Sequence, residues 1–157
     1  MSKLRFDIVA AMFAVVLTVL VVVQTQVAGK EPASSGPSLY KRLGGYDAIA
    51  AVTDDFIGRL ATDKKLSKFF VGLSDNSKAR VRQHVVDLIC ATTGGPCIYL
   101  GQDLKTAHKG LNITEAEWQA SVDDFTVTLD KFGVKQPERD ELFAILNKVK
   151  PDIVTAK

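Results

Sequence analysis

The sequence predicts an all-helical domain that follows an N-terminal apolar segment. After Leu39 no stretch alternates apolar and polar residues for long enough to form a sheet, and apolar residues recur at intervals of three and four behind capping residues. The chain has 157 residues, of which 46% are hydrophobic and 24% are charged. This length and composition are typical of one globular domain with an appendage, and they exclude a disordered protein.

The first element is an apolar run over residues 8–23, which contains no charged residue and follows two basic residues. A basic start before an apolar run is the order of a signal peptide. Continued through residues 8–27, the run reaches about the 20 residues that a helix needs to cross a bilayer. We therefore expect residues 1–29 to be either a cleaved signal peptide or an uncleaved membrane anchor. Residues 30–38, which are rich in serine and proline, should form a linker.

Both alternatives export the domain formed by residues 39–157, because the positively charged end of the segment stays in the cytoplasm. The domain is then periplasmic, or it is anchored in the cytoplasmic membrane through residues 8–27 and faces the periplasm. The excess charge of +2 lies in residues 1–30, so the basic and acidic residues of the domain balance. A neutral domain without a basic run is a poor binder of nucleic acid, and no nucleic-acid partner is expected.

The first half of the domain is expected to contain two long helices with a short turn between them. The first helix should begin at Asp47, which can cap it, and the turn should begin at Asp63 and end at Phe69 and Phe70. The second helix should start at Ser77 and stop before the Gly94-Gly95-Pro96 turn. The apolar stripes are Ile49, Val52, Phe56 and Leu60 in the first helix, and Val81, Val85 and Leu88 with His84 in the second.

The second half of the domain is expected to contain two more helices. Thr114-Glu115-Ala116-Glu117 fits a capping box, which should open a helix that runs to about Phe132. Pro137 suits the first turn of the last helix, and Pro151 should close or kink that helix. Their inward-facing residues should be Trp118, Val122, Phe125 and Leu129, followed by Leu142, Ile145, Leu146 and Val149.

The two cysteines, Cys90 and Cys97, flank the Gly94-Gly95-Pro96 turn. Because the turn brings the chain back toward itself, an oxidising compartment would allow a disulfide between them. Two buried apolar thiols are the alternative, since the spacing alone does not give the geometry.

The two histidines, His84 and His108, are the most informative polar residues. The sequence contains no His-Glu-x-x-His zinc motif, no glycine-rich phosphate loop and no Cys-x-x-Cys-His motif. A single histidine on an apolar stripe is most often a core residue. Two imidazoles on separate helices of a small helical domain could instead bind a planar iron cofactor from opposite faces.

Short segments resemble the group I truncated haemoglobins in one consistent order, from residue 39 to about residue 150. Any one of them is a weak signal, but the ordered set is specific. The segments are Leu39–Gly45 (LYKRLGG), Asp55-Phe56 with Arg59, Asp63–Leu66 before Phe69-Phe70, Gly94-Gly95-Pro96 with Tyr99 and Gly101, Ala107–Leu111 (AHKGL), and Phe132-Gly133-Val134.

The resemblance implies a two-over-two helical sandwich around a non-covalent haem b with its iron. His108 matches the proximal histidine, whose second ring nitrogen should be held by a backbone carbonyl or a carboxylate. Phe70 matches the phenylalanine that packs against the haem face. Tyr99 matches a residue near a haem propionate, although a half-exposed loop tyrosine is an equally good interpretation.

On the distal side the sequence departs from the family. Ile57 stands where the family usually has a tyrosine that donates to bound dioxygen. Val81 and Val85 take the places of polar residues, and Leu88 lies among the bulky ones. His84 matches a distal histidine that binds iron directly in some cyanobacterial relatives. It is therefore either the sixth ligand, which a gas must displace, or a side chain that points outward.

These features favour reversible binding of dioxygen, nitric oxide or carbon monoxide, rather than a primarily enzymatic role. One alternative is a nitric oxide dioxygenase, which needs an unidentified reductant and which the missing tyrosine disfavours. A second alternative is electron transfer or redox sensing through a bis-histidine haem, which His84 favours. A haem-free helical interaction module is the third, and it requires the ordered match around His108 to be accidental.

Overall fold

The computed structural model describes residues 36–156, and the described part contains helices and turns but no strand. The predicted signal or anchor segment, and most of the predicted linker, lie outside the described residues. The all-helical prediction is confirmed for the domain. The elements are α2 (Leu39–Arg42), α3 (Gly45–Thr62), the 3₁₀ helix η1 (Ser67–Phe70), α4 (Asp75–Thr92), α5 (Leu104–Ala107), α6 (Glu115–Lys131) and α7 (Gln136–Ile153).

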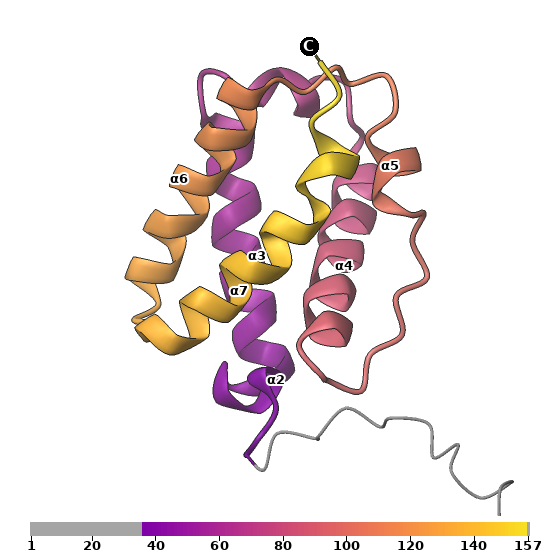
Figure 1. Ribbon diagram of the computed structural model, residues 1–157. Coiled ribbons are helices and arrows are strands. Elements are labelled where there is room, and N and C mark those ends of the chain that lie inside the picture. The colour runs from indigo at the N-terminus through magenta and orange to yellow at the C-terminus, as the bar shows by residue number, and fades with distance from the viewer. Residues whose placement is uncertain (1–35, 157) are drawn as a thin grey trace, which may run out of the picture. The chain divides into compact units, whose positions relative to one another are not determined.

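Helix α3 lies at the centre of the domain and packs against both α4 and α6, while α7 contacts α2 and α5 (Figure 1). The core has two parts, one on each side of α3. The part between α2, α6 and α7 contains Leu39, Phe125, Leu129 and Leu142. The part between α3 and α4 contains Ile49, Ala50, Val86 and Cys90.

Two helices begin earlier than the sequence predicts. Helix α3 starts after Gly44, whose φ of 96° requires glycine, so Asp47 lies in the first turn and is not the cap. Helix α4 starts after Ser74, which has extended backbone and accepts a hydrogen bond from the amide of Ser77. Ser77 is therefore a residue of the first turn. The prediction for Asp63 is confirmed, because its Oδ1 accepts from the amides of Lys65 and Leu66 at 2.7 and 3.1 Å.

The capping box of α6 is confirmed, with the Glu117 amide donating to Thr114 Oγ1 and the Thr114 amide donating to Glu117 Oε2. In α7, Pro137 lies in the first turn, as predicted. Pro151 does not close the helix, which continues to Ile153. Pro151 lies inside the helix but within its last turn, so one backbone donor is lost close to the helix end and the helix continues for two residues beyond it.

The C-terminal end of the described chain is bonded to the segment before α6. The amides of Thr155 and Ala156 both donate to the carbonyl of Ile113, each at 3.1 Å. Ile113 follows Asn112, whose φ of 50° makes it the one left-handed non-glycine residue of the described part. The residues that follow α7 therefore fix the short connection between α5 and α6.

None of the helices in residues 36–156 is both long enough and apolar enough to cross a membrane. The predicted span of residues 8–27 lies outside the described residues.

Candidate functional site

His108 lies directly after α5, a single turn that Asp103 caps by accepting from the amide of Thr106 at 2.9 Å. The imidazole is half-buried, and its Nδ1 lies 2.7 Å from the carbonyl oxygen of Leu104. A carbonyl only accepts, so Nδ1 carries a proton, and in the neutral imidazole Nε2 then has its lone pair free for a metal. This is the backbone bond that the resemblance implies for a proximal ligand.

Helix α4 has two apolar faces, and the predicted stripe is not the one in the core. Val86 and Cys90 are fully buried against α3. Val81, by contrast, is 38% exposed, and Val85 and Leu88 are only partly buried. The stripe that contains His84 is therefore an apolar face that the described chain covers incompletely. Such a face fits a flat apolar group such as haem, which would complete its burial.

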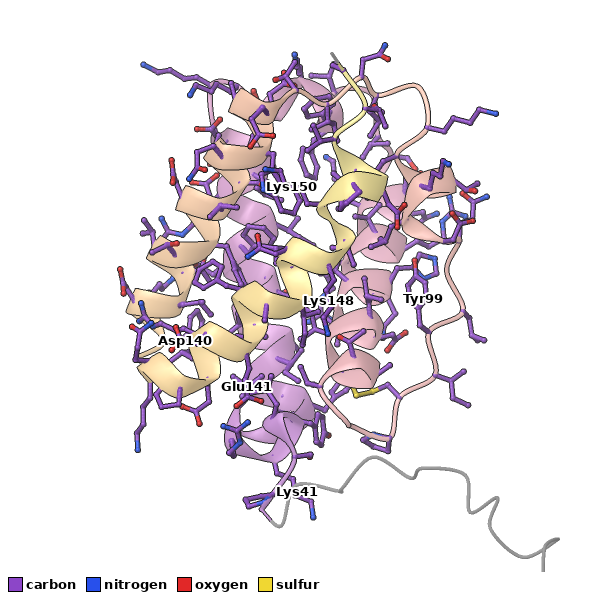
Figure 2. All side chains as sticks on the ribbon, in the orientation of Figure 1. Lys41, Tyr99, Asp140, Glu141, Lys148 and Lys150 are labelled. Atoms are coloured by element: carbon purple, nitrogen blue, oxygen red, sulfur yellow. A yellow bond between two sulfur atoms is a disulfide. The ribbon has the colours of Figure 1, made fainter. Side chains whose placement is uncertain are left out.

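His84 lies on this second face and contacts the ring of Tyr99. The two ring centroids are 6.0 Å apart and the planes cross at 75°, an edge-to-face arrangement. The Tyr99 hydroxyl donates to the carbonyl of Gln102 at 2.6 Å. Figure 2 shows Tyr99 on the segment between α4 and α5, alongside α4. The hydroxyl proton is thus used within its own loop. The predicted place of Tyr99 near a propionate stays a prediction.

Cys90 and Cys97 form a disulfide, with their Cα atoms 5.7 Å apart. The bond appears in yellow in Figure 2, at the end of α4. Gly95 lies inside the loop that the disulfide closes. A Cβ atom on Gly95 would fall 2.7 Å from Cys90 Sγ and 2.5 Å from the nearest atom of the Tyr40 ring. The glycine is therefore required for the loop to pack on α4.

The other two predicted haem contacts, Ile57 and Phe70, are both half-buried. Ile57 lies in α3, and Phe70 is the last residue of η1. The η1 turn is attached to α6 through Lys68, whose Nζ is 2.5 Å from Glu117 Oε1. The Lys68 ion pair, together with the bonds from Thr114, lowers the pKa of Glu117 to about 2. The capping carboxylate of α6 therefore stays charged and holds η1 at neutral pH.

Two further acidic residues, Asp55 on α3 and Asp124 on α6, have shifted pKa values, and Asp55 bonds α3 to α6. Asp55 accepts from Lys131, from Arg59 at 2.8 Å and from Thr128 at 2.9 Å, and these bonds lower its pKa to about 2. Burial raises the pKa of Asp124, whose Oδ2 is buried without a hydrogen-bond partner. Within residues 36–156 no group of three or more His, Cys, Asp or Glu side chains could hold a metal ion. The histidines are thus single imidazole donors, which suits an iron whose other ligands come from a porphyrin.

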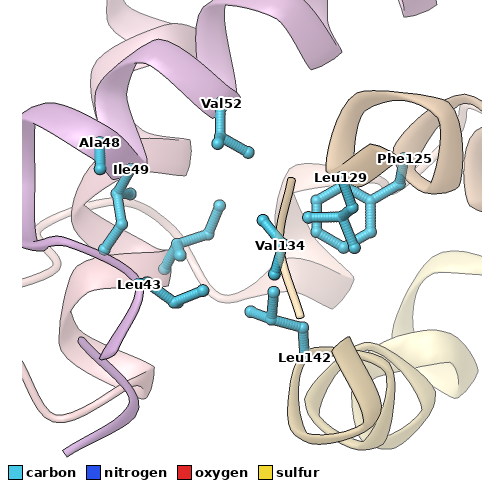
Figure 3. A pocket seen from close by; sticks show the side chains of 9 residues that line it. Leu43, Ala48, Ile49, Val52, Phe125, Leu129, Val134 and Leu142 are labelled. Atoms are coloured by element: carbon cyan, nitrogen blue, oxygen red, sulfur yellow. The ribbon is translucent and has the colours of Figure 1, made fainter. Parts of the chain in front are cut away.

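A small apolar cavity of about 30 Å³ lies in the core between α3, α6 and α7 (Figure 3). Its volume is roughly that of one water molecule. Sequence reasoning did not find it, because a void depends on how the helices pack. None of the predicted haem contacts lines it; the lining residues are Leu43, Ala48, Ile49, Val52, Ile89, Phe125, Leu129, Val134 and Leu142.

Comparisons with known proteins agree on one family. The family model described as bacterial-like globin matches residues 38–155. A group 1 truncated haemoglobin of Mycolicibacterium paratuberculosis is 31% identical over 127 residues, which cover 81% of this chain and 88% of that protein.

Solved structures show the same fold. A 2/2 haemoglobin from Synechococcus, in the cyanomet state with covalently attached haem, has a TM-score of 0.68 at 26% identity and covers 75% of this chain and 98% of its own. The truncated haemoglobin of Tetrahymena pyriformis has a TM-score of 0.69 at 24% identity, with 75% and 98% covered. The chain therefore belongs to the bacterial-like globins, as a group I truncated haemoglobin.

Proposed function

We propose that this chain binds haem b without a covalent bond, through His108, and that dioxygen, nitric oxide or carbon monoxide binds there reversibly. Haem with its iron is the cofactor of this family, and when bound it supplies a metal centre with a coordination position for a small gas. The observation that carries the proposal is the bond between His108 Nδ1 and the carbonyl of Leu104. It fixes the imidazole in the tautomer that a metal ligand needs.

The side chains proposed around the cofactor are mostly apolar. Val81, Val85 and Leu88 on α4, Ile57 on α3 and Phe70 on η1 are all incompletely buried by the described chain. Their role is to exclude water and to hold a flat group by dispersion and burial. They offer no hydroxyl or amide to a polar ligand, so the pocket should favour the less polar gases.

His84 supports a second candidate function, electron transfer or redox sensing through two histidine ligands. It lies on the same incompletely covered face of α4 as Val81, Val85 and Leu88. As a sixth ligand it would compete with gases and keep the pocket filled in their absence. Turnover of nitric oxide to nitrate is disfavoured, because Ile57 supplies no donor for dioxygen and the reaction needs a reductant.

We also propose that the domain is exported. The support is the sequence alone, in which two basic residues precede the apolar run of residues 8–27. A fusion of the full chain to alkaline phosphatase, which folds only where disulfides form, should be active. An inactive fusion that is present in full amount would contradict export.

The first experiment is absorption spectroscopy of the full-length chain loaded with haem, in its ferric, ferrous and carbon monoxide forms. We expect a haem band that His108→Ala abolishes or weakens strongly, while His84→Ala retains it. A low-spin, six-coordinate spectrum before addition of gas, lost in His84→Ala, would favour the redox candidate. A five-coordinate ferrous spectrum would favour plain gas binding. Unchanged haem affinity in His108→Ala would refute the proximal assignment.

A further inference from the structure

We infer that Tyr99 is a positioning residue for His84, and that the disulfide-closed loop from Cys90 to Cys97 in turn positions Tyr99. The inference rests on the proposed function, in which His84 faces the cofactor. It identifies the side chain that restricts the rotamers of the His84 imidazole. Neither the sequence pattern nor the family match assigns this role.

The direct observation is the edge-to-face contact between the two rings, with centroids 6.0 Å apart. A histidine side chain on a helix surface exchanges among rotamers on a fast timescale. A ring packed against its edge disfavours the other rotamers, so the imidazole spends more time in one position. Preorganisation of this kind strengthens ligation, because less freedom is lost when the ligand binds.

The Tyr99 ring is itself held tightly by the turn that follows it. Its hydroxyl donates to the carbonyl of Gln102 at 2.6 Å. A Cβ on Gly101 would fall 2.3 Å from the Tyr99 hydroxyl oxygen and 2.4 Å from its Cζ. The ring therefore lies directly on the backbone of Gly101, and only glycine leaves room for it there.

The start of the same segment is fixed to α4, the helix that carries His84. The Cys90–Cys97 disulfide joins the segment to the helix two residues before Tyr99. The Gly95 amide donates to the carbonyl of Cys90 at 2.8 Å, and the Tyr40 amide donates to that of Thr93 at 2.8 Å. His84 and Cys90 are about 9 Å apart along the helix axis at 1.5 Å per residue. The disulfide, the Tyr99 ring and the imidazole thus form one connected group of contacts.

The contrast with the neighbours of Tyr99 supports this assignment. Ile98 and Leu100 are 75% and 83% exposed, so the segment is not held by burial of its apolar side chains. The described contacts of its side chains are the disulfide, the Tyr99 hydroxyl bond and the Tyr99–His84 ring pair. Loss of the ring should therefore reach His84 directly, and loss of the hydroxyl bond alone should reach it much less, because the ring still packs on Gly101.

The test compares Tyr99→Leu, which removes the ring, with Tyr99→Phe, which keeps the ring and removes the hydroxyl bond. Gly101→Ala should displace the ring without altering it. Phe132→Leu and Gly58→Ala serve as controls, since Phe132 is 40% exposed at the end of α6 and a Cβ on Gly58 meets nothing within 4 Å.

The first readout needs no haem. In the full-length chain labelled with ¹³C-histidine, only two sets of imidazole signals exist, because His84 and His108 are the only histidines. We expect Tyr99→Leu and Gly101→Ala to move the His84 signals and to leave those of His108 in place. Tyr99→Phe should move them much less, and the two controls should move neither.

The second readout is the six-coordinate fraction of the haem-loaded protein and its rate of carbon monoxide binding. An edge-to-face ring pair is expected to change such an equilibrium roughly two- to tenfold. Tyr99→Leu should lower the six-coordinate fraction and speed carbon monoxide binding by that factor, and Tyr99→Phe should stay near the parent. Circular dichroism establishes that each variant is folded, and Gly101→Ala replaces Tyr99→Leu if the latter is not.

Unchanged His84 signals in both Tyr99→Leu and Gly101→Ala would overturn the inference. So would equal effects of Tyr99→Leu and Tyr99→Phe on the carbon monoxide rate, because the ring would then be irrelevant. A purely five-coordinate spectrum of the parent protein would show that His84 does not bind the iron. It would overturn the inference that Tyr99 preorganises His84 as a ligand. Failure to take up haem at all refutes the proposed function instead, and the haem-free signals still decide the contact.

Discussion

At the scale of single residues, Asp55 shows how one carboxylate joins two helices. It lies on α3 and accepts from Arg59 on the same helix and from Thr128 and Lys131 on α6. Its side chain is only 13% exposed, so these bonds are partly shielded from water. The donors stabilise the charged form and lower the pKa to about 2, so the contribution depends on pH.

We predict that Asp55→Asn lowers the free energy of unfolding at pH 7 by about 1–3 kcal/mol, since bonds to a charged acceptor are lost. The pKa is lower in the folded chain than in the unfolded chain, so the stabilisation is complete above about pH 4 and is lost as the pH falls toward 2. Urea unfolding of both proteins between pH 7 and 2 should show their difference narrowing over that window. Asp123→Asn on the exposed face of α6 is the control, and a difference independent of pH would contradict the mechanism.

Ile57 gives a second prediction at this scale. Ile57→Tyr restores a hydroxyl at the position where the family usually has one, and a buried polar acceptor gains roughly 1–3 kcal/mol from such a donor. Dioxygen dissociation should then slow by about 5- to 150-fold, while carbon monoxide dissociation changes much less. Stopped-flow measurements on the haem-loaded chain provide the test. Ile57→Phe, which has the ring without the hydroxyl, should not reproduce the effect.

The sequence singled out His84 and His108, and the structure adds the groups that hold them. For His108 the resemblance implied a backbone carbonyl or a carboxylate as the partner, and the structure shows the carbonyl of Leu104. The partner of His84 was not foreseen. Tyr99 lies on a segment without regular secondary structure, and no spacing rule places a loop side chain against a helix.

At the scale of elements, α6 depends on the contacts at its first turn. Thr114 and Glu117 bond each other reciprocally, and Glu117 also pairs with Lys68 of η1. We predict that Thr114→Ala costs about 1 kcal/mol of stability and lowers the melting temperature by about 4 °C. Thermal unfolding followed by circular dichroism measures this. Thr126→Ala, in the middle of the same helix, should have a smaller effect, and an equal effect would show that the cap is not responsible.

Helix boundaries and faces were predictable where one strong signal was present. The capping box gives the start of α6 correctly. In α4 both Ser74 and Ser77 are possible caps from the sequence, and the structure shows that Ser74 is the cap. The single turn of α5 was missed, because four residues are too few to show a period. The sequence predicts that Val81 and Val85 share one face of the helix. Periodicity does not distinguish a face that packs on another helix from a face that packs on a cofactor.

At the scale of the whole molecule, the disulfide is expected to matter for stability as well as for the site. Removing it with Cys90→Ala and Cys97→Ala should lower the free energy of unfolding by roughly 2–3 kcal/mol, since the closed loop is short. Urea unfolding of the variant and of the parent without reductant measures the loss. If the reduced parent protein is as stable as the oxidised parent, the loss in the double variant belongs to the side chains and not to the bond.

The double cysteine variant also tests whether the disulfide and the Tyr99 ring are coupled. If the disulfide acts on His84 through Tyr99, the effects of the cysteine changes and of Tyr99→Leu on carbon monoxide binding should not add. Additive effects would mean that the two act separately. The overall architecture was predictable from ordered short segments, but this coupling joins residues 84, 90, 97 and 99 through contacts that only a three-dimensional structure displays.

The bonds from Thr155 and Ala156 to Ile113 give residues outside the pocket an expected influence on haem retention, because they hold the connection that follows His108 and α5. Molecules cleaved before Thr155 would keep every predicted haem contact and are expected to release the cofactor faster. Preparations of this protein should therefore be compared by intact mass before differences in haem content are attributed to the pocket.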